Sequence, residues 1–357
     1  MRSVVLYCFL GLLARETLVT ALQVPRQNVV PLRESGEMEN PPEELLALHK
    51  KFHDAALIST QVRRDNNNGV PDISKTINTP INIDVYVHVV TGTEEGQKRA
   101  SDPIIQKQIG VLNDAFQGNF TFTLKDTDRK VNPVWAAGDD PDNMAASLHK
   151  GDAATWNLIL VDTIKERDGS TTLGRSSNPL FAGGSRDVSQ VNIDTLPGGS
   201  IPSFNLGKTA VHEAGHWVGL VHTFQGGCDG LGDGVDDTPA ERIASDSCTP
   251  RDSCPDKPGL DPINNYMDYS PDSCLTNFTP GQFVRARQMW ASKRARPVPG
   301  TPGSNDKSFR ELEAEFCEEN DLGVTMATCR LEIAKCAFEN EDAKDFDVVI
   351  KCLKSRI

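Results

Sequence analysis

Residues 212–222 carry the pattern that most constrains this chain, H-E-x-x-H-x-x-G-x-x-H. His212 and His216 are four positions apart, so on a helix both imidazoles project from one face and can share a metal ion. His222 follows six positions later, and a straight helix cannot bring it to the same ion. Gly219 allows the positive φ that a turn between them favours. The pattern therefore predicts a helix, a turn and three imidazoles around one metal.

This set of ligands predicts a reactive zinc ion. Three imidazoles leave the fourth zinc position open to water, as in catalytic rather than structural sites. Glu213 lies about 100° around the helix from His212, close enough to contact such a water. Zinc lowers the pKa of a bound water to about 7, and Glu213 can take its proton and pass it to a leaving amine. We therefore expect one catalytic zinc, with Glu213 as the general base.

The N-terminus and the charge limit the class of protein. An apolar run from Val4 to Leu13 follows Arg2, and small residues precede a cut after Ala21, which indicates a signal peptide over 1–21. The run is about half the roughly 20 residues that a membrane helix needs. A net charge of −13 argues against nucleic acid as the main partner. We expect a secreted, extracellular monomer with no membrane span.

Cysteines and sequons fit a secreted chain. Of the nine cysteines, Cys8 lies in the signal peptide, and none of the others forms a C-x-x-C pair that would suggest a thiolate zinc site. An even set in a secreted chain predicts disulfides, and four cysteines allow three pairings. Asn119 and Asn277 begin glycosylation sequons. The two cysteine clusters are Cys228, Cys248, Cys254 and Cys274, and then Cys317, Cys329, Cys336 and Cys352.

Composition divides the mature chain into four parts. Residues 22–75 are polar, with a helical pattern at 43–57, and are either a pro-segment or an N-terminal arm. Residues 76–294 carry the motif and form the catalytic domain. A linker rich in Pro and Gly follows at 295–306, and residues 307–357 form a small helical tail with the second cysteine cluster.

The catalytic domain predicts an α/β fold of the α+β kind with a mixed sheet. Asp102 is the expected N-cap of the first helix, and the strand at 157–161 is expected to be central. Residues 223–285 show little periodicity, so we expect an irregular segment clamped by the first cysteine cluster. Predicted strands are 81–90, 120–124, 157–161 and 190–193, and predicted helices are 102–116 and 208–221.

Over roughly residues 80–285 the chain resembles metzincins, and within them the pappalysin-like (M43) peptidases, most closely secreted fungal members. The resemblance rests on the zinc motif and on the segments LGKT at 206–209, HTFQGGC at 222–228, VDDTP at 235–239 and NYMDY at 265–269. It implies a zincin-like metzincin domain with an active-site helix and an irregular, disulfide-clamped C-terminal subdomain. It also implies a secreted zinc endopeptidase that acts on proteins or peptides.

The resemblance also assigns roles to single residues. Met267 would be the Met-turn residue, an apolar floor beneath the zinc histidines, although an ordinary core methionine fits the sequence too. Tyr269 would stand near the metal and stabilise the transition state through its hydroxyl; the alternative is a packed aromatic whose hydroxyl bonds the backbone. The strand at 190–193 would be the edge strand that pairs with substrate. The implied disulfides are Cys228–Cys254 and Cys248–Cys274.

An acidic loop follows the third histidine. Asp229, Asp233, Asp236 and Asp237 lie among glycines, and clustered carboxylates suit calcium. Similar peptidases bind calcium in this region, so Asp233, Asp236 and Asp237 are possible ligands; a solvated acidic turn is the alternative.

This sequence departs from its relatives in two respects. Ser273 stands where some relatives have an acidic residue that selects basic substrate side chains. Residues 22–227 contain no cysteine that could block the zinc, so latency would need another ligand, such as His49 or His53, or simple steric cover.

Two other functions are also compatible with the sequence. A secreted binding module could keep the metal site for structure, although a purely structural zinc needs four protein ligands and no base. A zinc hydrolase acting on something other than peptides has the same ligands. Loss of Glu213 should abolish turnover only if the chain is an enzyme.

Overall fold

The computed structural model describes residues 40–65, 80–166 and 168–295. The predicted signal peptide (1–21), the tail with its four cysteines and nearly all of the linker lie outside the described residues. Within the described part, no helix is long and apolar enough to cross a membrane.

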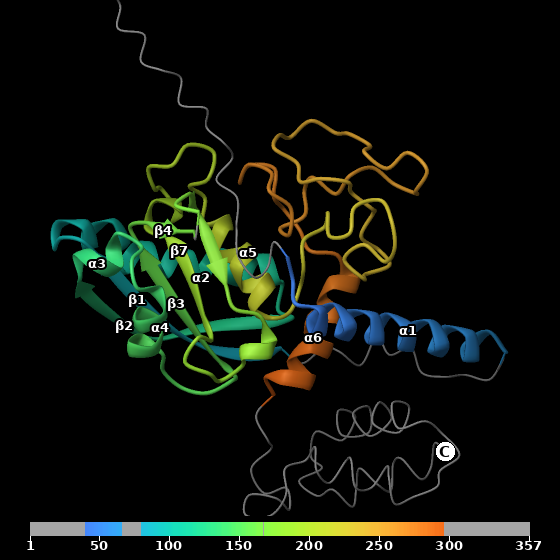
Figure 1. Cartoon of the computed structure of the whole chain (residues 1–357), viewed down its shortest axis with the longest axis horizontal. Coiled ribbons are helices and arrows are strands. Elements are labelled where there is room, and N and C mark those ends of the chain that lie inside the picture. Colours follow the sequence, from blue (N-terminus) through green and yellow to red (C-terminus); the bar gives the residue numbers. More distant parts are fainter. Residues whose placement is uncertain (1–39, 66–79, 167, 296–357) are drawn as a thin grey trace, which may run out of the picture. The chain divides into compact units, whose positions relative to one another are not determined.

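A five-stranded mixed sheet forms the centre of the region predicted to be the catalytic domain (Figure 1). Four strands are parallel and the fifth, at one edge, runs antiparallel to its neighbour. This mixed sheet confirms the predicted α/β class. In spatial order the strands are β2 (Phe120–Val131), β1 (Ile81–Thr91), β3 (Thr155–Val161), β7 (Val188–Asn192) and β6 (Gly174–Ser176).

The middle strands β1 and β3 were recognisable in the sequence because most of their residues are buried and apolar. Every residue of β3 is buried, and it lies third of the five strands, so its predicted central place is confirmed. In β1, Val85, Val87 and Val89 face one apolar cluster while Val90 faces another, because side chains alternate across a strand. The sheet is therefore covered on both faces.

β1 and β3 are one and two residues longer than predicted, and the other two strands differ more. β2 continues from Leu124 to Val131 because it pairs with β1 along its whole length, although this half is polar and largely exposed. The strand predicted at 190–193 begins at Val188, and it is not the edge strand. The edge position belongs to β6, whose three residues are too few to show an alternating pattern.

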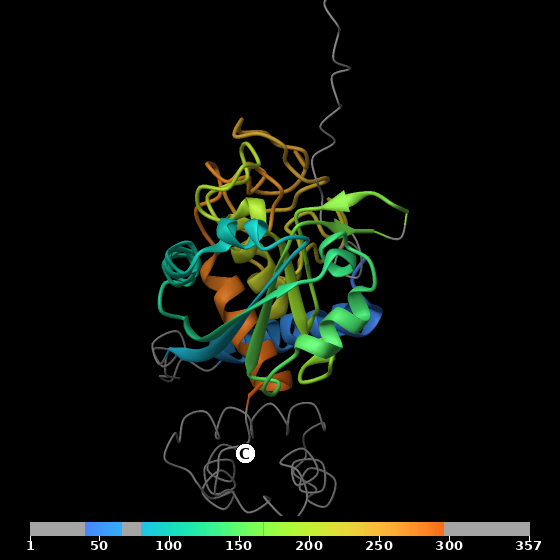
Figure 2. The same cartoon turned by 90° about the vertical axis from the view of Figure 1, so that its left-hand side faces the viewer.

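Helices cover the two faces of the sheet (Figure 2). On one face, α2 (Asp102–Phe116) and α5 (Lys208–Trp217) share the larger apolar cluster with the sheet. On the other face, α3 (Pro133–Ala136) and α4 (Pro141–Leu148) share the smaller cluster. The bounds predicted for α2 are correct, but its N-cap is Ser101 rather than Asp102. Ser101 keeps an extended backbone while its carbonyl accepts the first helical N–H groups.

Residues 223–279 run without a helix or a paired strand of their own, as predicted. Two disulfides, each closing a separation of 26 residues, hold this segment: Cys228–Cys254 and Cys248–Cys274. These are the pairs that the family resemblance implies. The segment ends earlier than expected because Thr279 and Gln282 form a capping box that starts α6 (Pro280–Lys293).

A long helix near the N-terminus, α1 (Glu43–Asp65), extends beyond the predicted 43–57. The remaining elements are short. They are the two-stranded pair β4 (Ile164–Lys165) and β5 (Thr171–Thr172), and the 3-10 turns Glu95–Ala100, Pro179–Phe181 and Ile193–Thr195.

Candidate active site

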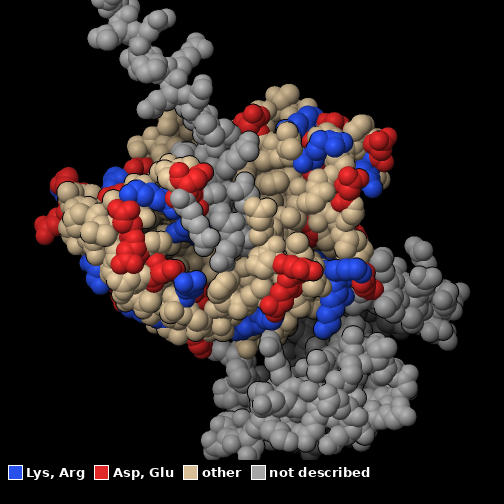
Figure 3. Space-filling view, in the orientation of Figure 1, with Lys and Arg blue, Asp and Glu red and all other residues tan. Residues whose placement is uncertain are grey.

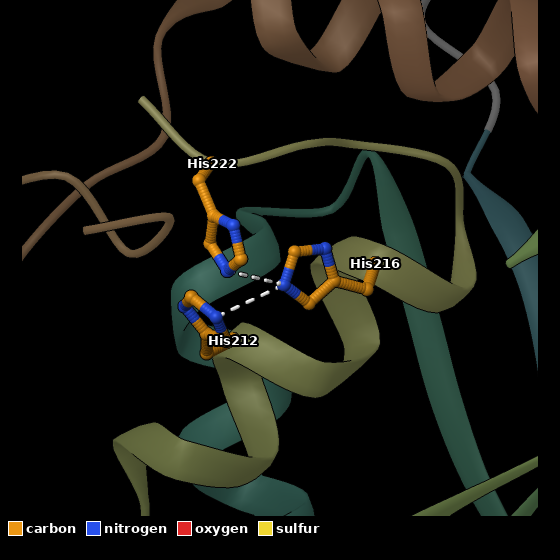
Figure 4. A group of neighbouring side chains, drawn as sticks. All are labelled: His212, His216 and His222. Carbon is orange, nitrogen blue, oxygen red and sulfur yellow. Dashed lines mark hydrogen bonds between the residues drawn. The ribbon is translucent and has the colours of Figure 1, made fainter. Parts of the chain in front are cut away.

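The three motif histidines meet at one point (Figure 4). His212 and His216 project from the same face of α5, and their Nε2 atoms are 3.0 Å apart. The Nε2 atom of His222 lies 3.1 Å from that of His216. All three side chains are buried.

A sharp turn returns the chain to the helix. α5 ends at Trp217 rather than at the predicted Val221, because Gly219 has a φ of 102°. A Cβ atom at Gly219 would also lie only 2.6 Å from Met289 Cγ. Both the backbone conformation and the lack of space therefore exclude a side chain at this position. The Leu220 N–H donates to the Gly215 carbonyl and closes the turn, which leads directly into His222.

Hydrogen bonds at the outer ring nitrogens fix two of the imidazoles. His212 Nδ1 lies 2.6 Å from the Tyr266 carbonyl and His216 Nδ1 lies 2.9 Å from the Leu220 carbonyl. A carbonyl oxygen can only accept, so Nδ1 carries the proton and Nε2 presents a lone pair. The converging Nε2 atoms are therefore electron-pair donors that face one another and suit a cation.

These residues fit zinc. Among the described residues, the three histidines are the one group of His, Cys, Asp or Glu side chains close enough to hold a metal, with ligand atoms within 4.8 Å of one another. Three neutral imidazoles, two of them held by hydrogen bonds from Nδ1 to backbone carbonyls, are a usual catalytic zinc set.

Glu213 is buried beside this group and faces the edge strand. A Cβ atom at Gly174, the first residue of β6, would overlap Glu213 Oε1, so strand and carboxylate are in close contact. Glu213 lines a pocket next to His212. Its other lining residues are Leu173, Gly174, Phe204, Lys208, Thr209, Asp268, Tyr269, Ser270, Asp272 and Leu275.

Part of the disulfide-held segment 223–279 packs against the motif helix α5. Met267 is fully buried, and its Sδ lies so close to Gly215 that a Cβ there would overlap it. The neighbouring Tyr266 carbonyl is the one that binds His212. The Tyr269 hydroxyl lies 3.1 Å from His222 Nε2, at the mouth of the same group. Met267 thus lies under the motif helix, and Tyr269 lies at the open side.

A family model matches the part of the chain that contains this site. The family model described as pregnancy-associated plasma protein-A (peptidase M43) matches residues 184–291. An extracellular metalloprotease of Pyricularia oryzae is 49% identical over 225 residues, covering 60% of this chain and 77% of that protein. One of Podospora anserina is 41% identical over 262 residues, covering 71% and 88%.

The chain belongs to the M43 peptidase family. It is therefore a zinc metalloprotease, and its substrates are proteins or peptides.

Solved structures support the fold of this M43 peptidase. Mirolysin in complex with a small compound is 25% identical, with a TM-score of 0.50 over 59% of this chain and 92% of that one. A mutant of Tannerella forsythia promirolysin is 22% identical, with a TM-score of 0.52 over 73% and 95%. The expected metzincin-like fold is thereby confirmed.

Charged groups also line the pocket of this M43 peptidase. Burial raises the pKa of the Asp272 carboxyl to about 6, although the N–H groups of Leu206 and Lys208 donate to it. Burial also lowers the pKa of the Lys208 ammonium. Ser273 does not line the pocket; its neighbour Asp272 does. Sequence reasoning missed Gly174, Lys208 and Asp272, because no local pattern places them beside the motif.

The acidic loop residues have protein partners. Asp237 accepts hydrogen bonds from Thr279 Oγ1 and the Gly281 N–H, and so supports the start of α6. Asp236 lies 3.0 Å from His53 Nδ1. Asp233 is buried, and burial raises its pKa to about 7. These carboxylates are not brought together as a metal-binding group in the described part of the chain, and calcium stays a prediction.

The remaining predicted sites lie at the surface. Asn119, in the turn between α2 and β2, and Asn277 are both partly exposed, and glycosylation stays a prediction. Lys and Arg side chains are interspersed with Asp and Glu on the described part of the face in Figure 3, in keeping with the mixed composition of the chain.

Proposed function

We propose that this M43 peptidase is a secreted endopeptidase that holds one zinc ion through His212, His216 and His222 and uses Glu213 as its general base. The convergence of three Nε2 atoms beside a buried carboxylate carries this proposal. The extracellular relatives support secretion.

Each side chain of the site has its own role in peptide-bond hydrolysis. Zinc, when bound, makes a water more acidic and polarises the substrate carbonyl. Glu213, buried in the pocket beside His212, accepts a proton from water and delivers it to the leaving amine. The Tyr269 hydroxyl donates to the oxygen that becomes negatively charged. Met267 and the carbonyls that bind Nδ1 keep the histidines in place.

The edge strand supports action within a polypeptide. β6 is hydrogen-bonded to β7 on one side and lies at the edge of the sheet on the other. An extended peptide can add to such an edge as a further strand. Because Gly174 of β6 touches Glu213, a peptide bound there would pass the base with its backbone. In this proposal β6 takes the role that the family resemblance gave to residues 190–193.

A doubly blocked peptide tests the endopeptidase assignment. The zinc-loaded protein is incubated with a peptide acetylated at its N-terminus and amidated at its C-terminus, and the products are identified by mass spectrometry. We expect internal cuts that a zinc chelator abolishes and added zinc restores. Cleavage confined to peptides with a free terminus would contradict the proposal. His222→Ala should lose zinc, which checks the ligand assignment independently of activity.

A further inference from the structure

The first half of α1 contacts the turn between the second and third motif histidines. His49 is buried, and its Nε2 lies 2.9 Å from the carbonyl of Gly219. Its other ring nitrogen, Nδ1, lies 2.7 Å from Nη1 of Arg285 on α6. One side chain of α1 therefore bridges the turn and α6.

A second, apolar contact lies one turn earlier on α1. Leu45 is fully buried against Val221 and Met289. Val221 directly precedes His222, and Met289 is the side chain that closes around Gly219. The turn is thus held at both of its ends, through its backbone by His49 and through a side chain by Leu45.

The chemistry of the partners fixes the protonation of His49. An arginine can only donate, so Nδ1 accepts, and the single proton of the neutral ring is on Nε2 and points to the Gly219 carbonyl. Burial and the neighbouring Arg285 lower the pKa of His49 to about 3. The ring therefore stays neutral, and the hydrogen bond to the turn persists through the neutral range.

The Gly219 turn needs such support. Glycine loses more conformational freedom on ordering than any other residue, so ordering this turn costs free energy that contacts with its neighbours must offset. His222 lies only three positions beyond Gly219, and the three Nε2 atoms must stay within about 0.5 Å of their arrangement to keep a metal site intact.

We propose that His49 is a positioning residue, and that α1 is an arm of the catalytic unit which holds the 219–221 turn so that His222 meets His212 and His216. The inference rests on the proposed function, in which His222 is a zinc ligand. It separates the two possibilities left open for residues 22–75: the part of α1 up to about Asp54 stays with the mature enzyme. His49 and His53 are consequently not latency ligands, since their partners are Arg285 and Asp236.

Zinc affinity is the property to measure, by competition with a chromophoric chelator, on five full-length proteins. The parent is compared with His49→Ala, His49→Gln, Leu148→Ala and His222→Ala. Gln can still donate to the Gly219 carbonyl. Leu148 is buried in the opposite apolar cluster, so its truncation lowers stability without touching the turn. We expect about a tenfold loss of zinc affinity in His49→Ala, as for other residues that orient ligands, and substantial rescue in His49→Gln.

Cobalt(II) substitution and steady-state kinetics separate positioning from general stability. In His49→Ala, the visible spectrum of bound cobalt should change and kcat should fall more than KM rises, whereas Leu148→Ala should match the parent in both. Equal zinc affinity in His49→Ala and Leu148→Ala would overturn the proposal. If His222→Ala keeps parental zinc affinity, the ligand assignment itself fails; if His222→Ala loses zinc and His49→Ala does not, only the positioning role fails.

N-terminal sequencing of the secreted, active protein gives a second test. We expect the mature chain to begin before Pro41, which is buried at the start of this arm. An active mature enzyme that begins after Asp54 and binds zinc as tightly as the longer form would overturn the proposal.

Discussion

Gly174 of the edge strand lies directly against the carboxylate of Glu213, so closely that a Cβ atom at this position would overlap Oε1. The contact joins the strand where substrate is proposed to bind to the residue proposed as the base. It also restricts the side chain of Glu213, which is buried on α5. A glycine at this point of β6 therefore serves the geometry of the site rather than the flexibility of the strand.

Gly174→Ala should lower kcat by displacing the Glu213 carboxylate and should leave zinc binding unchanged. The added methyl group must displace the Glu213 carboxylate, and general base catalysis contributes about 10²–10⁴-fold, so we expect kcat to fall about 10²-fold or more with zinc content unchanged. Gly110→Ala is the matched control, because a Cβ there meets nothing within 4 Å. It lies within α2 and should raise stability by about 0.5–1 kcal/mol with unchanged kcat. Parental kcat in Gly174→Ala would rule out the proposed contact.

Tyr269→Phe tests the role of the hydroxyl near His222. The ring keeps its packing against Phe224, at a centroid distance of 5.0 Å, so stability should change little. If the hydroxyl stabilises negative charge in the transition state, kcat should fall roughly 10²-fold with KM nearly unchanged. An unchanged kcat would favour the alternative of a packed aromatic without a catalytic part. Steady-state kinetics on a peptide of known cut site decides between them.

Arg294→Met should destabilise the protein strongly. Arg294 and Asp187 are both fully buried and bonded twice, at 2.7 and 2.9 Å, and Arg294 Nε donates to the Trp217 carbonyl at the end of α5. Removing one partner leaves a buried charge, which costs about 3–5 kcal/mol in the free energy of unfolding.

The control for this substitution is an exposed ion pair. Lys165 and Asp139 are 2.8 Å apart, but their side chains are 40% and 54% exposed. Lys165→Met should therefore change the free energy of unfolding by less than about 1 kcal/mol. Urea unfolding of both metal-free variants beside the parent measures the difference. A loss in Arg294→Met as small as that in Lys165→Met would contradict the buried network.

Asp272→Asn should change how stability depends on pH. Burial raises the pKa of Asp272 from 3.8 to about 6 in the folded protein, so the folded state binds the proton more tightly than the unfolded state. The stabilisation from this group is complete below about pH 4 and is lost as pH rises through about 6.

The difference between parent and variant isolates this group, because the histidines titrate in both. Asn cannot ionise, so Asp272→Asn should gain stability relative to the parent between pH 4 and 7, by up to about 3 kcal/mol. Urea unfolding at intervals across this range measures the gain. A difference that is flat with pH would show that Asp272 ionises normally.

The elements that could be predicted from the sequence are those with a long periodic or continuous run of apolar residues. The bounds of α2 were correct because its apolar residues recur at helical spacing, and β3 was correctly placed at the centre because it is apolar along most of its length. The zinc motif predicted its own turn, since the spacing of His216 and His222 admits no straight helix. These features depend on neighbours within a few positions, which a sequence displays directly.

The missed features depend on residues distant in sequence. Gly174 touches Glu213 across 39 positions, and His49 reaches Gly219 across 170. β6 was not recognised because three residues of Gly, Arg and Ser carry no pattern. α1 was predicted too short because its last eight residues, 58–65, are mostly polar and lack the apolar spacing of the earlier part.

The most direct test of the proposed mechanism compares the parent with Glu213→Gln at equal zinc content, using a denatured protein as substrate. Gln keeps the size of the side chain but cannot accept a proton. We predict that both proteins bind one zinc ion, that the parent cleaves, and that kcat in the variant is lower by about 10² to 10⁴-fold. Cleavage by Glu213→Gln at the parental rate, or two inert proteins with zinc bound, would contradict the account.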